Sequence, residues 1–299
     1  MRIEWSRDGR ELLSCFDGTL RRHARGDAQI LDGPNLLDAR WRDDGSIVTI
    51  DDLNRLQRIR DGKIEALPCR AEVIVRAARI TAADCYLARP LHGLFVSSFA
   101  GEELWAERYV ESDAPPSLAI SNDGKLVAFA TETHATADFN YQRKDGRGWR
   151  VIETRTKAVL DRTYAVTKRV PGATQLAFDA AGRRLAIATP EPGPSLGVVR
   201  VGKDETYARE HVGGARAVAL DDKGILAAYA YPRSIEAAPR RLRVDYLEPG
   251  AKGGSRIALV ETLWIDPDLD DIVALAFDRA SRRIACLDAS GRIDVVPVP

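Results

Sequence analysis

The sequence is poor in cysteine, histidine and methionine, with four, four and one of them among its 299 residues. Its four cysteines show no C-x₂-C or similar ligand spacing, and no two of its four histidines are spaced as metal ligands. The residue pattern therefore predicts no metal and no cofactor. The cysteines are expected to be inert thiols, mostly within or beside buried strands. They are Cys15, Cys69, Cys85 and Cys286.

Net charge and long apolar runs are also lacking. The 44 basic and 44 acidic residues give a formal net charge of zero, which argues against a global attraction to nucleic acid or to an anionic membrane. No run of 18 apolar residues occurs, and Met1–Trp5 has neither the basic nor the apolar region of a signal peptide. Only eight of the basic residues are lysines, a skew typical of GC-rich bacterial genomes. We expect a cytoplasmic bacterial protein.

What the sequence does contain is a repeated unit, clearest at Leu118–Ala130. A short apolar strand leads into an Asn-Asp-Gly turn, and a second apolar strand follows it. Glycine supplies the positive φ that such a tight connection needs, so the segment is typical of a β-hairpin. A single hairpin of this kind cannot bury both of its faces, and the unit predicts repeats that pack against one another.

The unit recurs with an apolar residue before the turn and glycine four residues later. Serine replaces glycine after Phe277, and an eroded copy around Ile80 fills the double interval between Trp41 and Ile120. The recurrence predicts seven copies, because the basic spacing is close to that of four-stranded propeller blades. The seven residues before the turns are Trp5, Trp41, Ile80, Ile120, Phe178, Leu220 and Phe277.

The pattern of apolar strand, Asp-Gly turn and apolar strand resembles the WD40-like and YVTN-type β-propeller superfamily over essentially the whole chain, without a repeating Trp-Asp dipeptide. We predict an all-β fold, a seven-bladed β-propeller of four-stranded antiparallel blades. One domain is expected to span residues 1–299. The expected blades are 1–33, 34–68, 69–113, 114–171, 172–213, 214–269 and 270–299.

The last blade is predicted to differ from the others, because the sequence ends after its third strand, near Arg292–Val298. Met1 already enters an inner strand, so no segment remains to complete this blade. Two alternatives follow: the ring closes by packing alone, or a partner or further polypeptide adds an edge strand.

Long insertions between the second and third strands of blades four, five and six are the strongest functional signal. They are residues 131–148, 189–195 and 231–239, and connections of the same type on consecutive blades share one sector of one face. Random variation in loop length is the alternative. The aromatic and basic residues expected to bind a partner there are Phe139, Tyr141, Arg143, Lys144, Arg147, Tyr231, Arg233 and Arg240.

Residues 143–169 contain nine basic and three acidic residues, which favours a partner protein with an acidic surface over nucleic acid. We interpret the chain as a non-catalytic protein–protein interaction scaffold in a bacterial multiprotein assembly. The alternative is a small-molecule-binding or hydrolytic propeller that uses its central channel. An enzyme is not expected, because the inner strands begin with mostly apolar residues.

Overall fold

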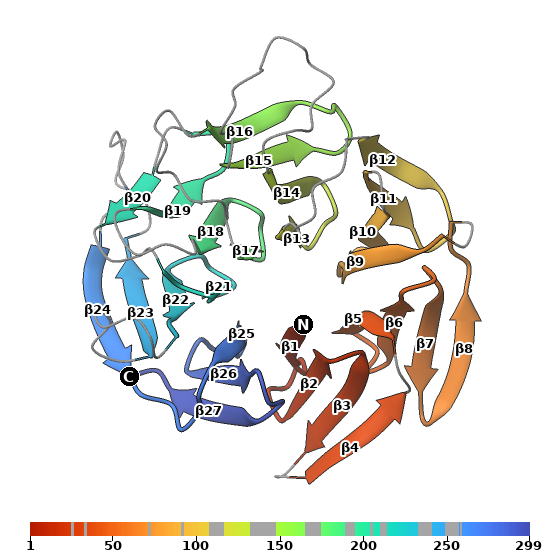
Figure 1. The fold of residues 1–299 in the computed structure, drawn as a ribbon, viewed down its shortest axis with the longest axis horizontal. Helices are drawn as coiled ribbons and strands as arrows, with labels where there is room; N and C mark the ends of the chain where they lie inside the picture. Colours follow the sequence, from red (N-terminus) through yellow and green to blue (C-terminus); the bar gives the residue numbers. More distant parts are fainter. Residues whose placement is uncertain are drawn as a thin grey trace.

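Seven antiparallel sheets form a ring in the computed structural model of the chain (Figure 1). Six sheets have four strands and the last has three, and no helix occurs in the described residues. The fold is therefore an all-β seven-bladed propeller, as the repeats predict. The described residues are 1–24, 27–32, 35–70, 73–90, 93–107, 117–131, 148–164, 175–188, 195–203, 206–209, 214–232, 241–248, 257 and 259–299.

Each blade runs from an innermost strand at the ring axis to an outer strand at the rim (Figure 1). The innermost strands are β1 (Arg2–Trp5), β5 (Leu36–Trp41), β9 (Val75–Ile80), β13 (Leu118–Ile120), β17 (Gln175–Phe178), β21 (Ala217–Leu220) and β25 (Ile272–Phe277). The second strands are β2 (Glu11–Phe16), β6 (Ile47–Asp51), β10 (Cys85–Pro90), β14 (Leu126–Thr131), β18 (Arg184–Ala188), β22 (Leu226–Ala230) and β26 (Arg283–Asp288).

The outer strands complete the sheets. The third strands are β3 (Thr19–Ala24), β7 (Leu56–Arg60), β11 (Leu94–Ser98), β15 (Gly148–Glu153), β19 (Ser195–Arg200), β23 (Leu242–Leu247) and β27 (Ile293–Pro297). The fourth strands are β4 (Asp27–Asp32), β8 (Lys63–Leu67), β12 (Glu103–Glu107), β16 (Val159–Tyr164), β20 (Thr206–Arg209) and β24 (Leu259–Ile265).

All seven residues predicted to precede a turn are the last residues of their innermost strands. Gly124, four residues after Ile120, has a φ of 73°, as the hairpin requires. In the eroded third copy Asp84 occupies this position with a φ of 48°, and in the seventh copy Ser281 does so with a φ of 58°. The turn conformation is thus retained where glycine is absent.

The core lies between the blades. In the described part of the chain each pair of neighbouring blades encloses one cluster of buried apolar side chains. The second strands supply much of it: every residue of β6, β18 and β22 is buried. Blades therefore stabilise one another face to face, which a single sheet could not do alone.

Blades seven and one meet by side-chain packing. Ile3 and Leu12 join Ala285 and Leu287 in one buried cluster. Trp5 Nε1 donates to the carbonyl of Ala276 at 3.2 Å. The two blades form separate sheets, so no strand is shared between them. Within the described residues these two blades meet by packing, and an edge strand added by a partner stays a prediction.

Arg283 secures this seam with one side chain. Its Nε donates to Asp278 Oδ2 at 2.9 Å, its Nη2 donates to the carbonyl of Gly9 at 2.7 Å, and its guanidinium lies 4.4 Å from the centre of the Trp5 ring. A cation over an aromatic face adds to the charge-assisted bonds. A similar contact joins blades five and six, where Arg184 Nη2 donates to the carbonyl of Glu248 at 2.8 Å.

The outer strand of blade seven, β27, is a poor template for a further strand. The N–H of Val295 already donates to Asp294 Oδ1 at 2.8 Å, and Pro297 has no N–H. Edge strands are commonly protected from pairing in this way. These two features disfavour the addition of a further strand at this edge.

Candidate functional site

Charged side chains gather at the ring axis beside blades one to four. Each innermost strand has an equivalent residue immediately before its last one, and we call these seven residues the axial layer. In blades one to three the axial-layer residue is charged and long, and in blades four to seven it is alanine. The axial layer consists of Glu4, Arg40, Arg79, Ala119, Ala177, Ala219 and Ala276.

An innermost strand has a neighbour on one side only, so part of its backbone faces the axis without a strand partner. Side chains from the preceding blade fill this need. Glu4 Oε2 accepts the N–H of Trp41 at 3.2 Å, and Asp38 Oδ2 accepts the N–H of Ile80 at 2.7 Å. Each carboxylate therefore caps the inner edge of the next blade.

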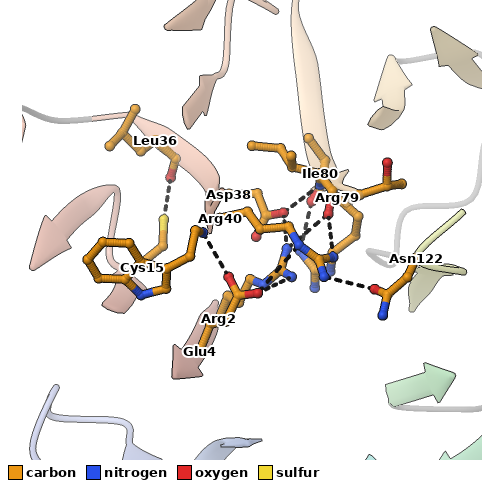
Figure 2. A network of polar contacts seen from close by, with 12 residues as sticks. Arg2, Glu4, Cys15, Leu36, Asp38, Arg40, Arg79, Ile80 and Asn122 are labelled. Carbon is orange, nitrogen blue, oxygen red and sulfur yellow. Dashed lines mark hydrogen bonds and ion pairs between the residues drawn. The ribbon is translucent and has the colours of Figure 1, made fainter. Parts of the chain in front are cut away.

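The same carboxylates hold two guanidinium groups in place (Figure 2). Arg2 Nη1 donates to Asp38 Oδ2 at 2.7 Å and to the carbonyl of Ile80 at 3.2 Å. Asp38 is fully buried, and 19% of the Arg2 side chain is exposed. Burial acts to lower the pKa of Arg2, but the charges of Asp38 and Glu4 outweigh it, so the pKa lies above its usual range.

Arg40 reaches across two blades. Its Nη1 donates to the carbonyl of Ile80 at 3.3 Å, and its Nη2 donates to Asn122 Oδ1, in the β13–β14 turn, at 2.9 Å (Figure 2). Its Nε lies 3.4 Å from Glu4 Oε1. Burial lowers the pKa of Arg40, the Glu4 charge opposes this effect, and the Arg2 charge adds to it. Burial and the neighbouring cation together outweigh the attraction of Glu4.

Arg79 is the third guanidinium of the group and has a different environment. Its Nη1 donates to the carbonyl of Ala78, its own neighbour in β9, at 2.8 Å. No carboxylate of the described residues lies within 4 Å of it. We call Arg2, Glu4, Asp38, Arg40 and Arg79 the axial cluster, which has three cationic and two anionic side chains.

The cluster can bind charged groups, but it does not resemble a catalytic or metal centre. Its members are guanidinium groups and ion-paired carboxylates, without a histidine, serine or cysteine nucleophile. No group of three or more His, Cys, Asp or Glu able to hold a metal ion occurs in the described residues. The nearby Cys15 is free and buried, and burial raises the pKa of its thiol to about 11. Such a thiol is unreactive near neutral pH.

The insertions have the predicted places in the chain. They lie between β14 and β15, β18 and β19, and β22 and β23, which are second and third strands of consecutive blades. Tyr231 is the one predicted binding residue in the described part, where it is 2% exposed and its ring lies 5.7 Å from that of Trp264. It packs in the core between blades five and six. Phe139, Tyr141, Arg143, Lys144, Arg147, Arg233 and Arg240 lie outside the described residues.

The axial cluster itself was missed from the sequence. Most inner strands do begin with an apolar residue, as expected, with Arg2 in β1 and Gln175 in β17 as exceptions. The other charged residues of the cluster, Glu4, Asp38, Arg40 and Arg79, lie further along their strands. The available signal was charge at alternate positions of two inner strands, Arg2 and Glu4 in one and Asp38 and Arg40 in the next. Alternation of this kind places the charged side chains on one side of a strand.

No protein-family model matches the sequence, and no curated protein matches it. Similar solved structures show the fold. The β-propeller domain of Cps50 (Swd1) from Myceliophteria thermophila has a TM-score of 0.61 at 15% identity, covering 99% of this chain and 96% of that one. A chain of a mitotic checkpoint complex has a TM-score of 0.63 at 8% identity, covering 99% and 86%. These likenesses agree with the seven-bladed β-propeller fold.

An enzyme is also among the similar structures. Hydrazine synthase from Kuenenia stuttgartiensis has a TM-score of 0.62 at 12% identity, covering 99% of this chain and 95% of that one. Because the same fold serves enzymes and non-enzymes, the likeness does not assign an activity. In the described residues, no helix is long and apolar enough to cross a membrane.

Proposed function

We propose that the protein is a non-catalytic interaction scaffold, a subunit of a bacterial multiprotein assembly in the cytoplasm. The observation that carries this proposal is the succession of three long connections at equivalent places in blades four, five and six. The strands that bound them lie next to one another around the ring (Figure 1). Equivalent connections leave the same face, so one sector of that face combines all three.

The basic excess of residues 143–169 supports an acidic protein surface as the partner. Arginine and aromatic residues are common anchors of protein interfaces. A similar propeller chain in a mitotic checkpoint complex shows that this fold occurs within protein assemblies. The zero net charge of the chain does not favour nucleic acid as the partner.

Capture of partners from lysate by two deletion variants tests the proposal. Removal of residues 134–147 is expected to abolish capture of a specific partner that wild type retains. The matched control removes residues 250–255, which connect the third and fourth strands of blade six and therefore leave the opposite face. This control is expected to capture the partner normally. Equal capture by both variants and wild type would place the interface elsewhere.

The alternative function predicted from the sequence, a small-molecule-binding or hydrolytic propeller, is favoured by one observation. Charged side chains converge at the axis, which a scaffold that binds only through its loops does not require. Binding is better supported than hydrolysis, because both carboxylates are engaged in ion pairs.

A further inference from the structure

The axial cluster has more positive charge than the fold requires. Four of its five side chains bond to the inner edge of a following blade: Arg2, Asp38 and Arg40 contact the backbone of Ile80, and Glu4 contacts that of Trp41. These contacts satisfy backbone groups that no strand pairs with. Their structural role is therefore clear.

Arg79 has no such role. Its one hydrogen bond in the described structure goes to the adjacent residue of its own strand, and it bridges no blades. The equivalent position in blades four to seven is alanine, so a propeller inner strand does not need a long cation there. A partly buried guanidinium without a carboxylate partner is costly to desolvate. A negatively charged ligand that pairs with Arg79 would offset this cost.

Two other cations near the axis are affected by neighbouring positive charge. The pKa of the Met1 amino group is lowered, first by burial and next by the Arg79 charge. The pKa of Arg40 is lowered despite its contact with Glu4. Burial is the largest cause in both cases, and a neighbouring positive charge adds to it: Arg79 for Met1 and Arg2 for Arg40. The alanines that complete the axial layer bring no negative charge to balance it.

We propose that the axial cluster binds a small oxyanion, a phosphate or carboxylate group, through Arg79 with Arg40. A guanidinium presents a planar fork of N–H donors that matches such groups bidentately. Asp38 and Glu4 hold Arg2 and Arg40 in place, so the cationic side of the site is preorganised (Figure 2). This site is independent of the loop surface proposed for protein partners.

Calorimetric titration of the full chain with inorganic phosphate at constant ionic strength tests the site. Wild type is expected to bind saturably, and R79Q to bind at least about tenfold more weakly, because it loses the forked donor. R79K keeps the charge without the fork and is expected to fall between them. A parallel titration with acetate distinguishes a phosphate site from a carboxylate site: the anion that binds more tightly identifies the preferred group.

The matched control is R76Q, which removes the same charge from an exposed position three residues earlier in β9. It is expected to bind like wild type. Equal weakening of phosphate binding by R76Q and R79Q would mean that the loss reflects only the change in net charge. That result would overturn the proposed site. No saturable binding of either anion by wild type up to about 10 mM would also overturn it.

Stability without added anion separates this role from a structural one. R79Q is expected to unfold at the same urea concentration as wild type, since Arg79 pairs with no described carboxylate. A large loss of stability in R79Q would assign Arg79 to the scaffold and contradict the proposal. The loop deletion of residues 134–147 is expected to leave phosphate binding intact, so the two proposals fail separately.

Discussion

Blades one to three and blades four to seven differ most at the ring axis. The first group carries Glu4, Arg40 and Arg79 in the axial layer, and the second carries alanine throughout. Yet all seven inner strands end at equivalent residues and enter equivalent turns. The comparison teaches that the turn and the second strand specify the blade, while the residue at the axis is free to carry charge.

The largest loss of stability is expected from D38A, which lies in blade two, among the blades with a charged axial layer. Asp38 is fully buried, pairs with Arg2 and accepts the N–H of Ile80. Its removal leaves a largely buried guanidinium without its carboxylate, which typically costs about 3–5 kcal/mol. Urea unfolding followed by circular dichroism measures the loss.

Q175A, in blade five, is the control for D38A among the blades with alanine in the axial layer. Gln175 Oε1 accepts the N–H of Val218 at 2.6 Å, so it caps an inner edge as Asp38 does, but without charge. Loss of a neutral hydrogen bond typically costs about 1 kcal/mol. Equal losses in D38A and Q175A would mean that charge contributes nothing to the difference between the two groups.

A219L tests whether alanine is required where the axial layer is uncharged. Ala219 is 6% exposed and packs in the cluster between blades six and seven. Overpacking a filled site costs about 1–3 kcal/mol. A289L, at an exposed turn position, is the control and is expected to change stability little. Wild-type stability in A219L would show that the alanines are not constrained by packing.

The smallest expected effect is a change in the pKa of Asp222, in the β21–β22 turn of blade six. Its pKa is raised by burial, then lowered by the Arg279 charge, raised by Asp221 and lowered by Arg40. R40Q removes one of the charges that favour the carboxylate, so the pKa of Asp222 is expected to rise further. Carbon-13 NMR titration of the carboxyl measures it, with R76Q as the unshifted control.

This shift has a defined consequence for stability. Because the native pKa of Asp222 lies above its unfolded value, its contribution is fully present below the unfolded pKa and is lost as pH rises through the native pKa. R40Q is expected to extend that decline to higher pH. An unchanged pKa of Asp222 in R40Q would show that the charge of Arg40 does not act on Asp222 across the axis.

The sequence was sufficient for the blade count because each copy is a local pattern. The residue before the turn, the positive-φ position and the apolar second strand lie within a dozen residues of one another, and even the eroded copy at Ile80 retains them. The residue types that form a β-hairpin can be recognised within so short a stretch of sequence. The places of the three insertions followed from the same register.

The axial cluster could not be derived in this way, because its contacts join distant parts of the chain. Arg40 and Asn122 are 82 residues apart, and Arg2 and Ile80 are 78. Which inner-strand side chain meets which backbone group depends on how neighbouring blades are rotated about one another, and no local pattern encodes this. Tyr231 shows the same limit, since its burial against Trp264 depends on the fourth strand of its blade.

The seam between blades seven and one joins two separate sheets, as every other seam in the ring does. The linear order of the blades is therefore a matter of covalent connection and not of contact. A circularly permuted chain, starting at blade four and ending with blade three, would bury the same interfaces. The packing between blades therefore does not depend on which blade comes first in the sequence.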